Sequence, residues 1–290
     1  MPSKLAIGTA QFGSVYGVAN KAGCVAEDEV HRILVKAKQE GIDMLDTASG
    51  YGKSETVLGR DSTNGWKIVS KLGALPGECV NVKEWVVDQV EGSLRRLNVS
   101  SLYALLIHNP DQLFESRGRE IISALQALKS AGLVKKLGVS IYDSLDLEAI
   151  STVIKLDIVQ APLNVLDSRL IDSGWSQRLF RQGVEIHVRS VFLQGLLLMK
   201  AGSRPEKFQK WSNLWAIWHE WLRANEVTPL QACLRHVLSF PEISKIVVGV
   251  ESVNQLGEIC AAIHGAPVDL PPLFRSNDKE LLDPFRWNTA

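Results

Sequence analysis

Residues 67–107 contain, in order, the segments KIVSK (Lys67–Lys71), VKEWVVDQVEGSLRRL (Val82–Leu97) and LYALLI (Leu102–Ile107). The first and third are short apolar runs of strand length, and the middle segment repeats apolar residues at helical spacing. Two strands joined through a helix in this way lie parallel in one sheet. This stretch therefore predicts a parallel sheet whose strands alternate with helices.

The same alternation extends to both ends of the chain. Further strands are expected at Lys4–Thr9, Met44–Asp46, Lys136–Val139, Ile158–Ala161, Glu185–Arg189 and Lys245–Val248. Further helices are expected at Glu27–Gln39, Ser54–Gly59, Arg117–Lys129, Asp146–Val153, Ser168–Arg181, Pro229–Leu238 and Val253–Ile263. Eight strands that alternate with helices favour an α/β fold of the (β/α)8 TIM barrel type, whose active site lies at the C-terminal rim. We assign residues 1–290 to a single barrel domain, with the tail 265–290 folding over that rim.

A doubly wound open sheet is the alternative arrangement for alternating strands and helices. That fold usually carries the pattern GxGxxG directly after its first strand, where the glycines make room for a dinucleotide. Here the first strand ends in GTAQFG, residues 8–13, which does not match. The barrel is therefore the preferred prediction.

Composition narrows the range of partners. The chain has 32 basic and 32 acidic residues, so its formal net charge is zero and nothing favours a nucleic acid or a membrane surface as partner. No run reaches the ~18 apolar residues needed to span a bilayer, and the N-terminus does not resemble a signal peptide. The four cysteines form no CxxC pair, so we expect neither disulfides nor a metal site. A cytoplasmic monomer or small homo-oligomer is expected.

One irregular insertion, Lys207–Leu222, carries four tryptophans at helical spacings of 4, 3 and 3 residues. These are Trp211, Trp215, Trp218 and Trp221. The pattern predicts one apolar helix face that packs on the barrel. A wall of the substrate cleft is the alternative interpretation.

Four polar residues follow neighbouring strands near the predicted rim: Asp46, Tyr51, Lys71 and His108. A phenol is a weak acid, and a nearby ammonium such as that of Lys71 stabilises its phenolate form. Asp46 can hold the ammonium charged, and His108 can donate a hydrogen bond to a carbonyl oxygen. Taken singly, each residue has an ordinary structural interpretation, such as a turn residue or a solvated charge. Their joint placement predicts a proton donor aimed at a carbonyl group.

Four motifs carry a family resemblance: DMLDTASGYG (43–52), KIVSK (67–71), LLIHNPD (105–111) and GVS (138–140). In this order they resemble the signatures of the aldo-keto reductase superfamily, in particular a bacterial member, and the resemblance covers nearly the whole chain. It implies hydride transfer between NADP or NAD and a small carbonyl compound, in either direction. It also implies that Asp46, Tyr51, Lys71 and His108 are the catalytic tetrad.

The resemblance also implies cofactor contacts. Ser140 and Gln160 match positions that hold the nicotinamide carboxamide. The segment 190–195 resembles a loop along the pyrophosphate, and the segment after the eighth strand resembles the surroundings of the adenosine 2′-phosphate, with the helix from Val253 pointing its N-terminus at that phosphate. The expected cofactor-binding residues are Thr9, Ser140, Gln160, Ser190, Phe192, Leu193, Gln194, Gly195, Gly249, Glu251, Ser252 and Gln255.

At the adenosine end the sequence departs from the family pattern. Many members carry a cationic or hydroxyl side chain where Glu251 stands, and often an arginine where Gln255 stands. A carboxylate repels a 2′-phosphate but can bond to a ribose hydroxyl. Preference for NADP or for NAD therefore stays open.

The expected substrate-binding residues are Phe12, Tyr16, Asn109 and Trp287. Trp287 lies in a tail that resembles a lid in this family, although a tail fixed to the side of the barrel by a buried aromatic is an equally simple interpretation. The segment 8–20 resembles bacterial members associated with sugar modification, which favours a sugar-like carbonyl. Two other functions stay open: a barrel lyase that forms a Schiff base on Lys71, and a non-catalytic cofactor-binding redox sensor.

Overall fold

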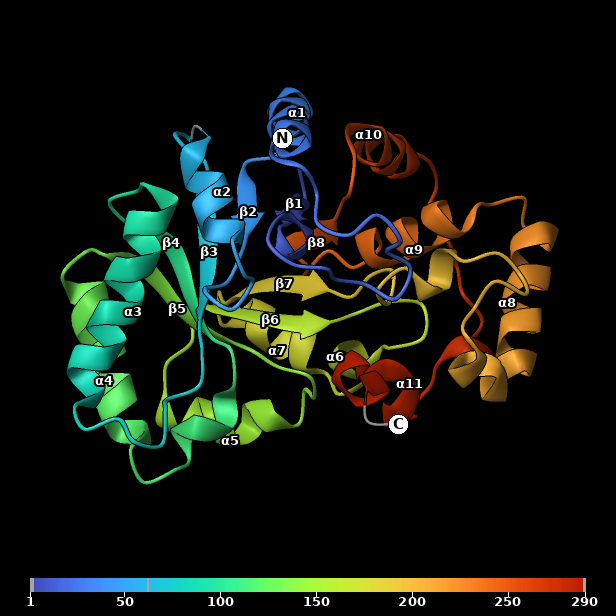
Figure 1. Cartoon of the computed structure of the whole chain (residues 1–290). Helices are drawn as coiled ribbons and strands as arrows, with labels where there is room; N and C mark the ends of the chain where they lie inside the picture. Colours follow the sequence, from blue (N-terminus) through green and yellow to red (C-terminus); the bar gives the residue numbers. More distant parts are fainter. Residues whose placement is uncertain (1–2, 62, 289–290) are drawn as a thin grey trace.

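The computed structural model describes residues 3–61 and 63–288, which include a closed barrel of eight parallel strands in the order β1 to β8 (Figure 1). The barrel closes where β1 pairs with β8, with Leu5 opposite Ile246. The strands are β1 Leu5–Gly8, β2 Met44–Asp46, β3 Lys67–Leu72, β4 Leu102–Ile107, β5 Val134–Ser140, β6 Ile158–Pro162, β7 Glu185–Arg189 and β8 Lys245–Gly249. The predicted barrel is confirmed, and the doubly wound alternative is excluded.

Helices surround the barrel (Figure 1). They are α1 Glu27–Gln39, α2 Ser54–Arg60, α3 Val82–Leu97, α4 Gly118–Ser130, α5 Asp146–Val153, α6 Arg169–Asp172, α7 Trp175–Arg181, α8 Ser212–Ala224, α9 Pro229–Leu238, α10 Val253–Ala262 and α11 Lys279–Leu282. Short 3-10 segments are η1 Ala10–Phe12, η2 Pro110–Leu113, η3 Leu196–Leu198, η4 Glu206–Trp211, η5 Pro272–Phe274 and η6 Pro284–Asn288. The prediction of one helix over 168–181 is wrong, because Gly174 adopts a left-handed φ of 76° that separates α6 from α7.

The interior of the barrel is filled by side chains. Ala6, Met44, Val69, Ala104, Leu106 and Ile158 form a buried inner cluster, separate from the larger core between the strands and helices. Since the interior is packed, a ligand has access only to the ends of the barrel. Polar side chains that follow the C-terminal ends of the strands are therefore the ones available for chemistry.

The tryptophan-rich insertion forms η4 and α8, outside the ring of strands (Figure 1). Trp218 is fully buried, stacks on Trp221 at 5.9 Å and meets the ring of Phe274 edge-on at 5.5 Å. Its Nε1 donates a hydrogen bond to the carbonyl oxygen of Leu197. This helix face is therefore apolar and packed, as predicted, but the contacts of Trp218 are with η3 and η5.

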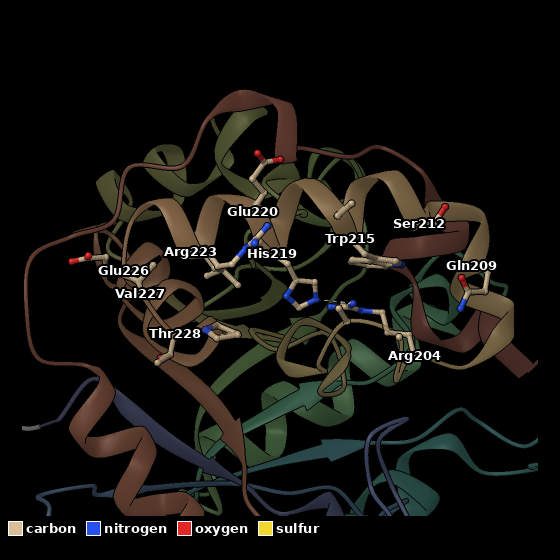
Figure 2. Close-up of a pocket in the computed structure, with 15 residues that line it drawn as sticks. Arg204, Gln209, Ser212, Trp215, His219, Glu220, Arg223, Glu226, Val227 and Thr228 are labelled. Atoms are coloured by element: carbon tan, nitrogen blue, oxygen red, sulfur yellow. Dashed lines mark hydrogen bonds between the residues drawn. The ribbon is translucent and has the colours of Figure 1, made fainter.

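Trp215 borders a separate hollow of about 1010 Å³ beside α8 (Figure 2). In it, Nη1 of Arg204 lies 3.1 Å from Nε2 of His219, and the guanidinium lies over the Trp215 ring. This hollow shares no lining residue with the cleft at the strand ends. The tryptophans are thus not a wall of that cleft.

The tail lies against loops that follow β5 and β6. Lys279 forms an ion pair with Asp143, and Asp283 forms one with Arg169 at 3.0 Å. The ring of Phe285 contacts that of Tyr142 at 4.8 Å. Within residues 3–61 and 63–288, no helix is long and apolar enough to cross a membrane.

Candidate functional site

The structure brings the four expected catalytic residues together at the C-terminal rim. Lys71, in β3, donates a hydrogen bond of 2.6 Å to Oδ1 of Asp46, the last residue of β2, and both side chains are buried. The Lys71 ammonium lies 5.0 Å from the centroid of the Tyr51 ring. The rings of Tyr51 and His108 meet edge-to-face at 6.2 Å. Phenol, ammonium, carboxylate and imidazole therefore form one cluster.

A close approach of two loops fixes the backbone that carries Tyr51. Gly13, in the loop after β1, packs so tightly that a Cβ there would lie 2.0 Å from the carbonyl oxygen of Tyr51. Gly52 has φ 55°, and a Cβ at that position would meet the carbonyl oxygen of Gly13. Both positions require glycine, so the two loops hold Tyr51 jointly.

The charges in the cluster are unequal. Burial alone would lower the pKa of Lys71, but the charges of Asp46 and Tyr51 raise it, so the ammonium form persists. His108 is partly exposed to solvent, yet desolvation by the surrounding protein and the positive charges of Lys71 and Arg189 lower the pKa of His108 to about 4. The site thus presents a permanent cation beside the phenol and a neutral imidazole, an arrangement suited to proton transfer at an oxygen atom.

Gln160 connects this cluster to the far side of the barrel mouth. Its Nε2 donates a hydrogen bond of 2.6 Å to Oδ2 of Asp46, and its Oε1 accepts one of 3.5 Å from the hydroxyl of Ser140. Both residues are buried; Ser140 is the last residue of β5 and Gln160 is the middle residue of β6. The two residues expected to hold a carboxamide therefore form a chain of hydrogen bonds with Asp46, in which Gln160 contacts Asp46 and Ser140 contacts Gln160.

A cleft of about 330 Å³ extends from Asp46 and Tyr51 to α10. Of the residues expected to bind cofactor or substrate, those that line it are Thr9, Tyr16, Ser190, Phe192, Gln194, Gly195, Gly249, Glu251 and Gln255. Two other expected residues do not line the cleft: Leu193 is fully buried in the core, and Ser252 caps α10. Sequence reasoning missed Arg189, Glu258 and Gln11 among the lining residues.

The loop after β7 has an unusual backbone. Ser190, Leu193, Gln194 and Gly195 have φ values of 59°, 48°, 52° and 86°, and three of these four residues are not glycine. Non-glycine residues in this region are strained, and such strain is concentrated at ligand-binding segments. The N–H groups of Leu193 and Gly195 donate hydrogen bonds to the carbonyl oxygens of Ser190 and Phe192, so the turn is stabilised from within.

The N-terminus of α10 is already hydrogen-bonded within the protein. The N–H of Val253 donates to Glu29 of α1 at 2.7 Å, and the N–H of Gln255 donates to the Ser252 hydroxyl at 3.2 Å. The side chain of Gln255 accepts from the N–H of Glu251. The N–H groups of Val253 and Gln255 at this helix end are therefore already paired within the protein, and the Glu29 carboxylate lies beside them.

Three of the four residues expected to bind substrate, Phe12, Asn109 and Trp287, do not line this cleft. Phe12 is buried in the core, and Asn109 caps η2 by accepting from the N–H of Asp111. Trp287 packs against Phe208 at 4.9 Å and donates from Nε1 to the carbonyl oxygen of Glu280. The Trp287 ring therefore fixes the tail to η4.

Comparison with known proteins agrees with this geometry. Residues 4–269 match the model of the Aldo/keto reductase family. The chain is 28% identical over 285 residues to L-galactose dehydrogenase of Arabidopsis thaliana, covering 90% of this chain and 84% of that protein. It is 24% identical over 266 residues to the NADH-specific methylglyoxal reductase of Escherichia coli K12, covering 80% and 81%. An aldo-keto reductase from Bacillus halodurans, solved in its holo form, superposes with a TM-score of 0.73 at 20% identity over 92% of this chain and 89% of that one, which shows a shared fold.

Proposed function

This chain belongs to the aldo/keto reductase family and is an NAD(P)H-dependent oxidoreductase, and we propose that it interconverts an aldehyde or ketone and its alcohol with Tyr51 as general acid and base. The observation that carries the proposal is the buried Lys71–Asp46 pair beside the Tyr51 ring. A buried ammonium next to a phenol stabilises the phenolate that remains when the phenol gives up its proton.

When bound in this cleft, NAD(P)H would supply the hydride for the carbonyl carbon. The hydroxyl of Tyr51 gives its proton to the carbonyl oxygen, and in the oxidative direction the Tyr51 phenolate takes the proton from the alcohol. Asp46 keeps Lys71 charged in both the reductive and the oxidative direction of the reaction. The N–H of the neutral His108 imidazole donates a hydrogen bond to the same oxygen and so fixes its position.

The L-galactose dehydrogenase relative supports a sugar-like substrate, and its name points to the oxidative direction for that protein. The raised pKa of Lys71 disfavours the Schiff-base alternative, because an amine must lose its proton before it can attack a carbonyl. The test is consumption of NADH or NADPH by the purified protein with 4-nitrobenzaldehyde. Tight cofactor binding without turnover across a broad panel of carbonyls would favour the redox-sensor alternative, and borohydride trapping on Lys71 would favour the lyase.

We further infer that NAD(H) is preferred over NADP(H). Glu251 and Glu258 line the end of the cleft at α10, where we place the adenosine. Beside them, the Glu29 carboxylate accepts a hydrogen bond from the N–H of Val253. These carboxylates oppose a 2′-phosphate, whereas a ribose hydroxyl can donate a hydrogen bond to either of the two that line the cleft. The NADH-specific relative in Escherichia coli supports the same inference.

A further inference from the structure

Arg189 is a cation at the catalytic end of the cleft that the mechanism above does not use. It is the last residue of β7 and lines the cleft together with Asp46 and Tyr51. Its Nη2 donates to the carbonyl oxygen of Ile141 at 2.9 Å, and its Nη1 donates to the Ser190 hydroxyl at 3.3 Å. A guanidinium has five N–H donors, so three have no protein partner within residues 3–61 and 63–288.

No carboxylate among the described residues lies within ion-pair distance of Arg189. Asp46 is engaged by Lys71 and Gln160, while Glu251 and Glu258 line the cleft at α10. The catalytic end therefore holds two cations, Lys71 and Arg189, against one carboxylate, Asp46, which leaves a net charge of +1. The charge of Arg189 also contributes to the lowered pKa of His108, so its field reaches the reacting groups.

The position of Arg189 favours a substrate contact over a contact with the cofactor phosphates. Nη2 reaches across β6 to the carbonyl oxygen of Ile141, directly after β5, and Nη1 contacts the side-chain hydroxyl of Ser190, so neither bond uses an N–H group of the loop after β7. The ring of Tyr142 covers the guanidinium at 4.2 Å, and Phe285 of the tail contacts that ring. Both rings are partly exposed, so the cation lies beside an apolar aromatic surface.

We propose that Arg189 binds a carboxylate carried by the carbonyl substrate, so that the preferred substrates of the reaction proposed above are acidic aldehydes or ketones. The planar fork of a guanidinium matches the two oxygens of a carboxylate, and the negative charge neutralises the excess cation at the rim. The aromatic pair Tyr142 and Phe285 provides a surface for the carbon skeleton of the substrate. This inference depends on the proposed function.

The test compares 4-carboxybenzaldehyde with the isosteric neutral 4-formylbenzamide. The amide withdraws electrons more strongly from the aldehyde, so intrinsic reactivity works against the expected preference. In the native protein kcat/KM is expected to favour the acid by about 10–100-fold, the value of a charge-assisted hydrogen-bond pair. Arg189→Gln is expected to bring that ratio close to one. Arg178→Gln, which removes a guanidinium stacked on Trp175 and paired with Glu148 outside the cleft, is expected to keep the native ratio.

A native ratio near one overturns the proposal, as does a high ratio that survives in Arg189→Gln. The proposal is also overturned if Arg189→Gln lowers kcat/KM equally for both aldehydes and weakens NADH binding by fluorescence titration, because Arg189 would then bind the cofactor. Calorimetric binding of 4-(hydroxymethyl)benzoate to the NADH-loaded protein needs no turnover. If neither aldehyde reacts but this acid binds and Arg189→Gln abolishes binding, the proposed function fails and the anion site stands. If it does not bind, the anion site fails as well.

Discussion

The side-chain amide of Gln160 donates a hydrogen bond of 2.6 Å to Oδ2 of Asp46, the carboxylate oxygen that Lys71 does not occupy. Because β2 and β6 lie on opposite sides of an eight-stranded barrel, this contact spans the barrel mouth. Asp46 is thus held at both oxygens, by Lys71 and by Gln160. The Lys71 ammonium beside Tyr51 also donates to the carbonyl oxygen of Thr47 at 2.9 Å.

Gln160→Leu is expected to lower kcat by about 10-fold or more, since it removes a hydrogen bond to a charged group, of the kind valued at about 1.5–3 kcal/mol. Asp46 would hold Lys71 less rigidly, so the pH profile of kcat is expected to shift as well. Gln209→Leu, at the separate hollow beside α8, is the matched control and is expected to change neither quantity. A loss of thermal stability in Gln160→Leu with kcat and its pH profile unchanged would show that the contact is only structural.

Gly13→Ala is expected to reduce both stability and kcat, because the new methyl group would overlap the carbonyl oxygen of Tyr51 and the N–H of Ser54. The backbone must shift, and displacement of a catalytic group by about 1 Å costs on the order of 10²-fold in rate. Gly50→Ala, one residue before Tyr51 in the same turn, meets no atom within 4 Å and is the control. Thermal unfolding and steady-state kinetics on both variants test this; native kcat in Gly13→Ala would contradict it.

His108 is expected to titrate near pH 4 when its imidazole signals are followed by NMR. Since its pKa in the folded protein is below the value of 6.5 expected in the unfolded chain, protonation of His108 destabilises the fold as the pH falls from about 6.5 through 4 and has no effect above that window. Lys71→Met should move the midpoint upward, because the positive charge that opposes protonation is removed. A midpoint at or above 6.5 in the native protein would refute the neutral imidazole.

Fluorescence titration is expected to give a lower Kd for NADH than for NADPH, because carboxylates line the adenosine end of the cleft. Glu251→Arg should reverse or abolish the difference by tightening NADPH binding about 10-fold or more, the scale of a charge-assisted contact with phosphate. Glu148→Arg, on the outer surface at α5, controls for the change in net charge. Tighter NADPH binding by the native protein would show that Glu251 and Glu258 do not exclude the phosphate.

The barrel, and the meeting of polar side chains at its rim, were predictable because both follow from the periodicity of the strands. Once the strands are located, parallel order brings their C-terminal ends to one rim, and Asp46, Lys71 and His108 must meet there. Phe12, Asn109 and Trp287 do not line the cleft, because loop and tail conformations depend on tertiary contacts such as the packing of Trp287 against Phe208.

Arg189 was overlooked for a different reason. A cation at a strand end resembles an ordinary solvated charge until the structure shows that no described carboxylate pairs with it. Its position directly after four strand residues of β7 and before Ser190 was the available signal. The break at Gly174 was similarly hidden, because a single glycine in a helical pattern is often tolerated.

The most direct test of the account compares Tyr51→Phe with the native protein in the reduction of 4-nitrobenzaldehyde. Loss of the phenolic proton is expected to lower kcat by about 10²–10⁴-fold, the usual contribution of a general acid, with the Kd for NADH within about 2-fold of native. Tyr103→Phe, which removes a hydroxyl bonded to Glu185 away from the cleft, is the control and should retain native kcat. A Tyr51→Phe protein that turns over at the native rate would contradict the assignment of Tyr51 as proton donor.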